Sequence, residues 1–391
     1  MIMEGEFIKR FFKLFVSIPL IILLLMSSKV LASEAVSGIE DKIKLNDFLE
    51  NIKQYSNEYF PELANKQYLE ELLNGKVANE DSGIIEKIIK VLTGEFKNNI
   101  SLIFKIIGIA ILCSILKSIQ SSFSEKGIGE VAFYTCYLMI VTLIITSFTN
   151  IVTLCGETVD KLSDFMNMVV PLIFTLITIT GNITAISFMQ PVIIGMITVI
   201  TFLLNKFIIP IIYVATVINI VTNISSYIKL DKLSNVLKKS SLWLMELCLI
   251  IFTGILSIEG SLAASVDGMT SKIAKNVVSS SIPVVGKILG DTVDSVLGGV
   301  AITKNAIGVI GVIAILAITV GPLIKSLIIM MIFNLSTALI EPIADSRIYK
   351  CMNGISESLK IIVGILAIVI FIFLIAITMM LKVSNSALMY K

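Results

Sequence analysis

Long uncharged, apolar runs recur along this 391-residue chain, and they constrain its fold more than any other feature. A helix needs about 20 mainly apolar residues to cross a membrane, and only helices and closed barrels satisfy their backbone groups there. We therefore predict an all-α, polytopic membrane helix bundle. The nine candidate spans are residues 100–118, 131–152, 165–186, 191–205, 207–226, 241–258, 306–321, 323–340 and 359–381.

The composition agrees with this prediction and excludes much catalytic chemistry. Apolar residues make up 56% and charged residues 15% of the chain, against about 45–50% and 25% in soluble domains. Histidine is absent, which removes the commonest general base, the usual zinc ligand and any imidazole triad. The net charge of +2 does not indicate a nucleic-acid partner. We expect no enzyme activity, cofactor or metal site, and membrane lipid as the surroundings.

Residues 1–32 have the pattern of a signal peptide. Lys9, Arg10 and Lys13 precede an apolar stretch at 14–26, and small residues lead up to Ala32. The apolar stretch is short for a span, so cleavage near Ala32 is favoured over a retained anchor. With either outcome, the following residues begin outside the cytoplasm.

Residues 33–98 form the predicted small extracytoplasmic helical appendage. They carry 13 acidic and 8 basic side chains, a net charge of −5. Apolar residues at spacings of three and four predict one helix that ends at Pro61 and a second that ends at Asn74-Gly75. A third helix beginning near Asp81-Ser82 either lies along the membrane surface or packs on its neighbours.

The charged connections predict the orientation of the spans. Four lysines against one aspartate place residues 228–240 in the cytoplasm, and excess acid places residues 153–164 outside. Residues 191–226 and 306–340 could each form two spans, a re-entrant hairpin or one long tilted helix. From an outside start, the lysine-rich connection is cytoplasmic only if 191–226 crosses twice. This count favours two spans there, with breaks at Asn205-Lys206 and Gly321-Pro322, and a C-terminus inside.

A glycine-rich amphipathic segment at 259–305 divides the bundle into residues 99–258, with about six spans, and residues 306–391, with two to three. Its second half has an apolar face and a charged face, and two glycines four residues apart permit close helix contact. The segment is either a hairpin that lines a pore or contacts a partner, or a cap folded on the bundle. The candidate partner-binding or gating residues are Pro283, Gly286, Lys287, Gly290, Asp291, Asp294, Lys304 and Asn305.

Three ionisable residues are candidate intramembrane polar groups, namely Glu246, Lys206 and Lys325. A charge inside a span is costly, which indicates a function such as a proton or ion relay. Glu246, however, lies about one turn from the start of its predicted span, so its side chain could reach the cytoplasmic interface. The same two interpretations apply to Lys206, Lys325 and Lys105.

Several short motifs follow one another in a fixed order along nearly the whole chain. The most specific is Ser-Ile-Pro-Val-Val-Gly at 281–286, followed by Asp291, Asp294 and Lys-Asn-Ala-Ile-Gly at 304–308. Further motifs lie at residues 60–63, 111–116, 165–166, 237–239, 254–257 and 267–270. Together they resemble the stage III sporulation protein AE family of endospore-forming bacteria.

The resemblance implies a structural membrane component of a sporulation-specific, secretion-like channel complex that links mother cell and forespore and is needed for forespore development. It implies as partners the other membrane proteins of the same operon and a forespore protein, and as location the mother-cell membrane around the forespore. The family has no known catalytic residues to transfer. The alternative is a self-sufficient small-solute transporter, which usually has an internal repeat, and we find none.

Overall fold

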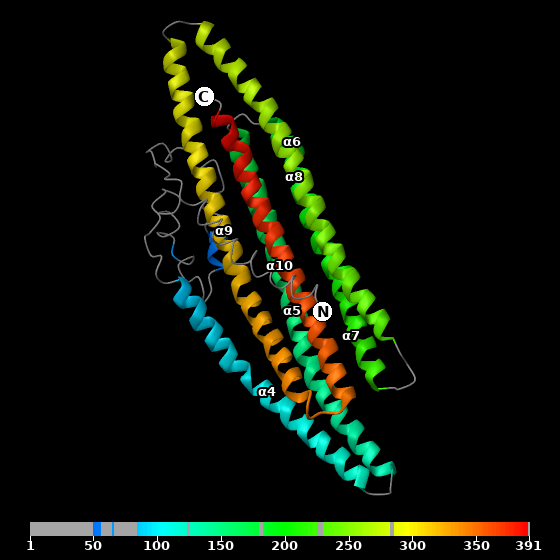
Figure 1. Ribbon diagram of the computed structural model, residues 1–391. Helices are drawn as coiled ribbons and strands as arrows, with labels where there is room; N and C mark the ends of the chain where they lie inside the picture. Colours follow the sequence, from blue (N-terminus) through cyan, green and yellow to red (C-terminus); the bar gives the residue numbers. More distant parts are fainter. Residues whose placement is uncertain are drawn as a thin grey trace.

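The computed structural model describes residues 50–55, 65, 84–122, 126–179, 183–224, 230–281 and 285–389 (Figure 1). Nearly all of these residues are helical and none forms a strand, which confirms the predicted all-α membrane bundle. The main helices are α4 (Ile84–Ser122), α5 (Lys126–Ile179), α6 (Ile183–Leu203), η3 (Leu204–Ile208), α7 (Ile209–Ile224), α8 (Asp231–Ser281), α9 (Val285–Ile340) and α10 (Ser346–Met389).

Within the described ranges, six helical stretches are long and apolar enough to cross a membrane, with α6, η3 and α7 forming one of them. The prediction of nine spans is therefore wrong. The predicted spans 131–152 and 165–186 both lie in α5, and the predicted outside loop 153–164 is helical. The apolar stretch of α5 has 47 residues, about 70 Å at 1.5 Å per residue. This is more than twice the roughly 30 Å of hydrocarbon.

The two regions for which the sequence left alternatives open, 191–226 and 306–340, fall within single helical stretches over their described residues. At Asn205-Lys206 the chain passes through the π-helical turn η3 and continues without reversing. At Pro322, α9 also continues, although the missing N–H of the proline leaves the Ile318 carbonyl without its helical donor. Proline and polar residues are tolerated inside membrane helices because side chains and local π turns satisfy the freed backbone groups.

Helix α10 packs against α9, α8, α5 and α7, and one large cluster of buried apolar side chains joins these helices. Helix α4 packs on α9 and α5. It meets α5 at their shared connection and diverges from it toward its own start (Figure 1). A second, smaller cluster of Ile103 with Ile324, Ile328 and Ile332 holds α4 on α9. Among the described residues, the divergence leaves part of the face of α5 beside α4 open, which forms a groove.

An ion pair ties α4 to the connection between α9 and α10. Lys117 donates to the carboxylate of Asp345, and the backbone N–H of Arg347 donates to the same carboxylate at 2.8 Å. Burial alone would raise the pKa of Asp345. These hydrogen bonds and the two positive charges outweigh burial and lower that pKa below its ordinary value.

The two predicted extramembrane parts are described only in part. Helix α4 begins at Ile84, so the predicted third appendage helix is continuous with the first span. Within the segment 259–305, residues 259–281 form the end of α8 and residues 285–305 the start of α9. Earlier in the chain, the ring of Tyr55 packs edge-on against Phe165, with 5.4 Å between ring centroids. The predicted signal peptide, Pro61 and the helix predicted to end at Asn74-Gly75 lie outside the described residues.

Candidate functional site

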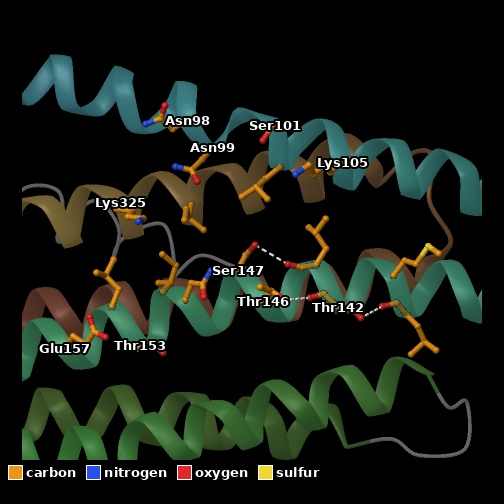
Figure 2. A pocket seen from close by; sticks show the side chains of 18 of the residues that line it. Asn98, Asn99, Ser101, Lys105, Thr142, Thr146, Ser147, Thr153, Glu157 and Lys325 are labelled. Atoms are coloured by element: carbon orange, nitrogen blue, oxygen red, sulfur yellow. Dashed lines mark hydrogen bonds between the residues drawn. The ribbon is translucent and has the colours of Figure 1, made fainter.

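A polar groove of about 1110 Å³ runs between α4 and α5 and has α9 as its floor (Figure 2). Its position follows from the fold, because α4 and α5 diverge and leave α9 between them. The lining is unusually polar for helices that are otherwise apolar. The polar lining residues are Asn98, Asn99, Ser101, Lys105, Thr135, Thr142, Thr146, Ser147, Asn150, Thr153, Glu157 and Lys325.

Helix α5 contributes a continuous polar stripe to the groove. Six of its polar residues, from Thr135 to Glu157, follow one another at spacings of 7, 4, 4, 3 and 4, which keeps them on one helix face. The stripe covers 22 residue steps, or about 33 Å, close to the thickness of the hydrocarbon core. A polar stripe of this length can cross most of a membrane.

Three of the four threonine hydroxyls of the stripe, those of Thr135, Thr142 and Thr146, are satisfied within α5. Thr142 donates to the Leu138 carbonyl at 2.8 Å, and Thr146 donates to the Thr142 carbonyl at 2.8 Å (Figure 2). Such bonds to the carbonyl four residues earlier allow threonine inside an apolar helix. The oxygen lone pairs that remain give the groove hydrogen-bond acceptors.

Three exposed ionisable side chains line the groove, one from each helix: Lys105, Glu157 and Lys325. Lys105 and Lys325 lie inside uncharged runs, at 16 and 13 residues and at 22 and 15 residues from the two ends of their stretches. Since 13 residues of helix measure about 20 Å, these two lysines cannot reach the ends of their stretches by snorkelling. Glu157 lies at the start of a charged cluster that continues with Asp160, Lys161 and Asp164.

The lysines and the glutamate do not neutralise one another. No ion pair within 4 Å joins Glu157 to Lys105 or Lys325, and within the described part of the chain none of the three has a hydrogen-bond partner. The groove therefore presents two ammonium groups and one carboxylate to its surroundings. Within the described residues, no hydrogen bond joins a lining hydroxyl to Lys105, Glu157 or Lys325, and the groove offers charged and hydrogen-bonding groups for binding.

The other two predicted intramembrane polar residues lie away from the groove. Lys206 is exposed in η3, where its neighbour Asn205 donates a hydrogen bond of 2.6 Å to Asp160. Glu246 is half-buried on α8. Of the predicted set, only Lys325 lines the groove.

The predicted partner-binding residues lie mostly at the start of α9. Gly286, Lys287, Gly290, Asp291 and Asp294 belong to its first turns, and Pro283 lies outside the described residues.

Lys304 and Asn305 lie further along α9 and differ in exposure. Lys304 is fully buried, and its Nζ donates to the Leu381 carbonyl of α10 at 3.0 Å. Asn305 is half-buried. The ammonium of Lys304 thus contacts α10 inside the bundle.

A second buried lysine was missed by the sequence reasoning, which placed Lys238 in a cytoplasmic loop. Its side chain is 2% exposed, and its Nζ donates to the Gly354 carbonyl at 2.6 Å. Glu357 lies 3.8 Å from the same Nζ. A signal was available: Ser234, Lys238, Ser241, Met245, Cys248 and Phe252 recur at spacings of three and four, and all are buried. This period marks the inner face of α8.

No metal centre is visible in the described segments, since nowhere in them do three cysteine, aspartate or glutamate side chains gather as ligands. Cys155 and Cys351, like the other cysteines, are free thiols.

Comparison with known proteins identifies a matching family and a sequence relative. A family described as stage III sporulation protein AE matches residues 63–384. The stage III sporulation protein AE of Bacillus subtilis (strain 168) is 27% identical over 365 residues, which cover 93% of this chain and 91% of that protein. No solved structure matches the chain.

Proposed function

Because the chain belongs to the stage III sporulation protein AE family, we propose that this sporulation-related membrane protein is a structural component of a secretion-like channel complex linking mother cell and forespore. The observation that carries the proposal is the groove. Its three charges have no partner in the described part of the chain, and the two that lie in uncharged runs, Lys105 and Lys325, are costly against lipid. A subunit of a larger complex would have this face covered.

In this proposal the protein has no catalytic role of its own and acts by assembly with other membrane proteins of its operon and with a forespore protein. Its location is the mother-cell membrane around the forespore. The segments 33–83 and 259–305 would face the space between the two membranes and contact partners there.

The orientation follows from six crossings and the positive-inside rule. If the chain starts outside after a cleaved signal peptide, three crossings by α4, α5 and α6–α7 bring it to the cytoplasm at residues 225–230. The lysines near this connection then lie inside, as the sequence predicts. Six crossings return the C-terminus to the outside, in place of the inside position expected from nine spans.

The second candidate is a self-sufficient transporter of small solutes, and the same groove supports it, because mid-span polar groups are typical of substrate sites. Purified protein in liposomes separates the two. Solute movement without any partner would favour the transporter, whereas a component of the complex should move none.

Deletion of the gene tests the proposal. We expect a strain without it to stop at forespore development and to lose late forespore gene expression, and an intact copy to restore both. Normal late forespore expression in the deletion strain would refute the role. A charge reversal at Asp291 should weaken assembly more than one at Lys42, and equal effects would remove the start of α9 from the proposed contact surface.

A further inference from the structure

The groove between α4 and α5 carries an uncompensated positive charge. It presents the ammonium groups of Lys105 and Lys325 and the carboxylate of Glu157, and these groups do not pair with one another. Lys105 and Lys325 lie in uncharged runs within apolar stretches long enough to span a membrane. An ionised group at that depth is costly without a partner or water, so the groove calls for an occupant with a negative charge.

The shape and lining of the groove fit a helix better than a headgroup or a solute. The stripe on α5 extends over about 33 Å, far longer than one headgroup. Thr142, Thr146 and Asn150 follow one another four residues apart. Small and hydroxyl-bearing residues at this spacing let membrane helices approach closely, and polar side chains then bond between helices.

We propose that the groove is the docking site for a transmembrane helix of another membrane protein, and that this helix carries a carboxylate that pairs with Lys105 and Lys325. The carboxylate changes the groove's net charge from +1 to neutral. The asparagines and threonine oxygens bond to the rest of the partner's polar face. The inference rests on the proposed function, because it names the chemistry of one partner within the complex.

Photo-crosslinking in membranes of sporulating cells tests the docking. A photoreactive amino acid replaces Thr142 or Thr146, and the control position is Val217, which is 54% exposed on α7 and lies outside the groove. We expect the two groove positions, and not the control, to crosslink to a transmembrane peptide of a different protein that contains aspartate or glutamate. Mass spectrometry identifies the peptide.

Charge variants then test the pairing. The double variant K105E/K325E should reduce the crosslink at least tenfold, and K105R/K325R should keep it. Because a reversed charge could also harm folding, a lysine introduced at the partner's acidic position should restore the crosslink with K105E/K325E. Failure of this charge exchange, with the partner and both variants present at normal levels, would overturn the pairing.

Other results would overturn the docking itself. A crosslink to lipid or to a second copy of this chain would give the groove a different occupant. Rapid modification of T142C by a membrane-impermeant charged thiol reagent, in a variant without the native cysteines, would show a water-filled passage.

The outcomes also separate this inference from the proposed function. If the acidic helix crosslinks but deletion leaves the forespore normal, the docking stands and the channel role fails. If deletion blocks the forespore but no acidic helix is found, only the docking fails.

Discussion

Gly354 of α10 is the position where one added methyl group should change stability most clearly. It faces Asn219 of α7, which is buried, and a Cβ at residue 354 would fall on the amide group of Asn219. The Gly354 carbonyl also accepts the hydrogen bond from Lys238. G354A should therefore push α7 and α10 apart at a point where three helices meet.

Gly364, on the same helix, provides the matched control. A Cβ there would meet only Leu242 Cδ1 at 3.9 Å, an ordinary contact. Replacing glycine by alanine inside a helix gains about 1 kcal/mol at either position, so this gain cancels when the two variants are compared. The remaining difference is the cost of overpacking, about 1–3 kcal/mol. We expect G354A to be less stable than G364A by that amount.

The free energy of unfolding can be measured by titrating SDS into protein held in a mild detergent. The variant N219A/G354A should recover most of the loss, because it removes the side chain on which the new methyl group falls. If G354A and G364A have equal stability, or if N219A gives no recovery, the close contact between α7 and α10 does not exist as described.

Two further changes probe charged groups outside the groove. K238A should destabilise the protein by about 2–4 kcal/mol in the same titration, because it loses the charge-assisted hydrogen bond to Gly354 and the packing of the buried stem. The control K239A, at an exposed neighbouring residue, should change stability by less than about 0.5 kcal/mol. Equal losses in the two variants would contradict the burial of Lys238. The pKa of the Asp345 carboxyl is lowered in the folded protein. The stability that this carboxylate contributes is therefore fully present above its unfolded pKa of about 4, and it is lost as the pH falls through the lowered pKa of the folded state. A comparison of wild type and D345N between pH 7 and pH 3 should show a smaller acid-induced loss in D345N, and parallel curves would show that the contact with Lys117 is not stabilising.

The sequence predicts the class of the fold well but not the number of helices. Apolar run lengths identify a membrane bundle because lipid imposes a minimum length on each span. Local polar or helix-breaking residues, such as Asn205 and Pro322, do not reveal whether a membrane helix ends. In the structure the chain passes through a π turn at Asn205-Lys206 and through Pro322 inside α9, and both helices continue. The cytoplasmic position proposed for residues 225–230 does not change. Two pairs of predicted spans before that point are each merged into one, so the chain crosses the membrane two times fewer and arrives on the same side.

The groove could be predicted only in part. The polar stripe on α5 is readable as a helical period, and Lys325 stands out as a charge within an apolar run. That α4 and α9 bring Lys105 and Lys325 to the stripe depends on tertiary packing, which no local pattern encodes. Lys238 shows the opposite case. Its burial follows from the period of α8, whereas the excess of four lysines over one aspartate at 228–240 led to its assignment as a loop residue.

The central claim is that this protein serves the forespore by engaging a partner through the groove. The most direct test is late forespore gene expression in strains whose only copy is wild type, K105R/K325R or K105E/K325E, with protein levels matched. We predict normal expression with the two arginines and expression at the level of the deletion strain with the two glutamates. Normal expression with the glutamates at positions 105 and 325 would contradict the account.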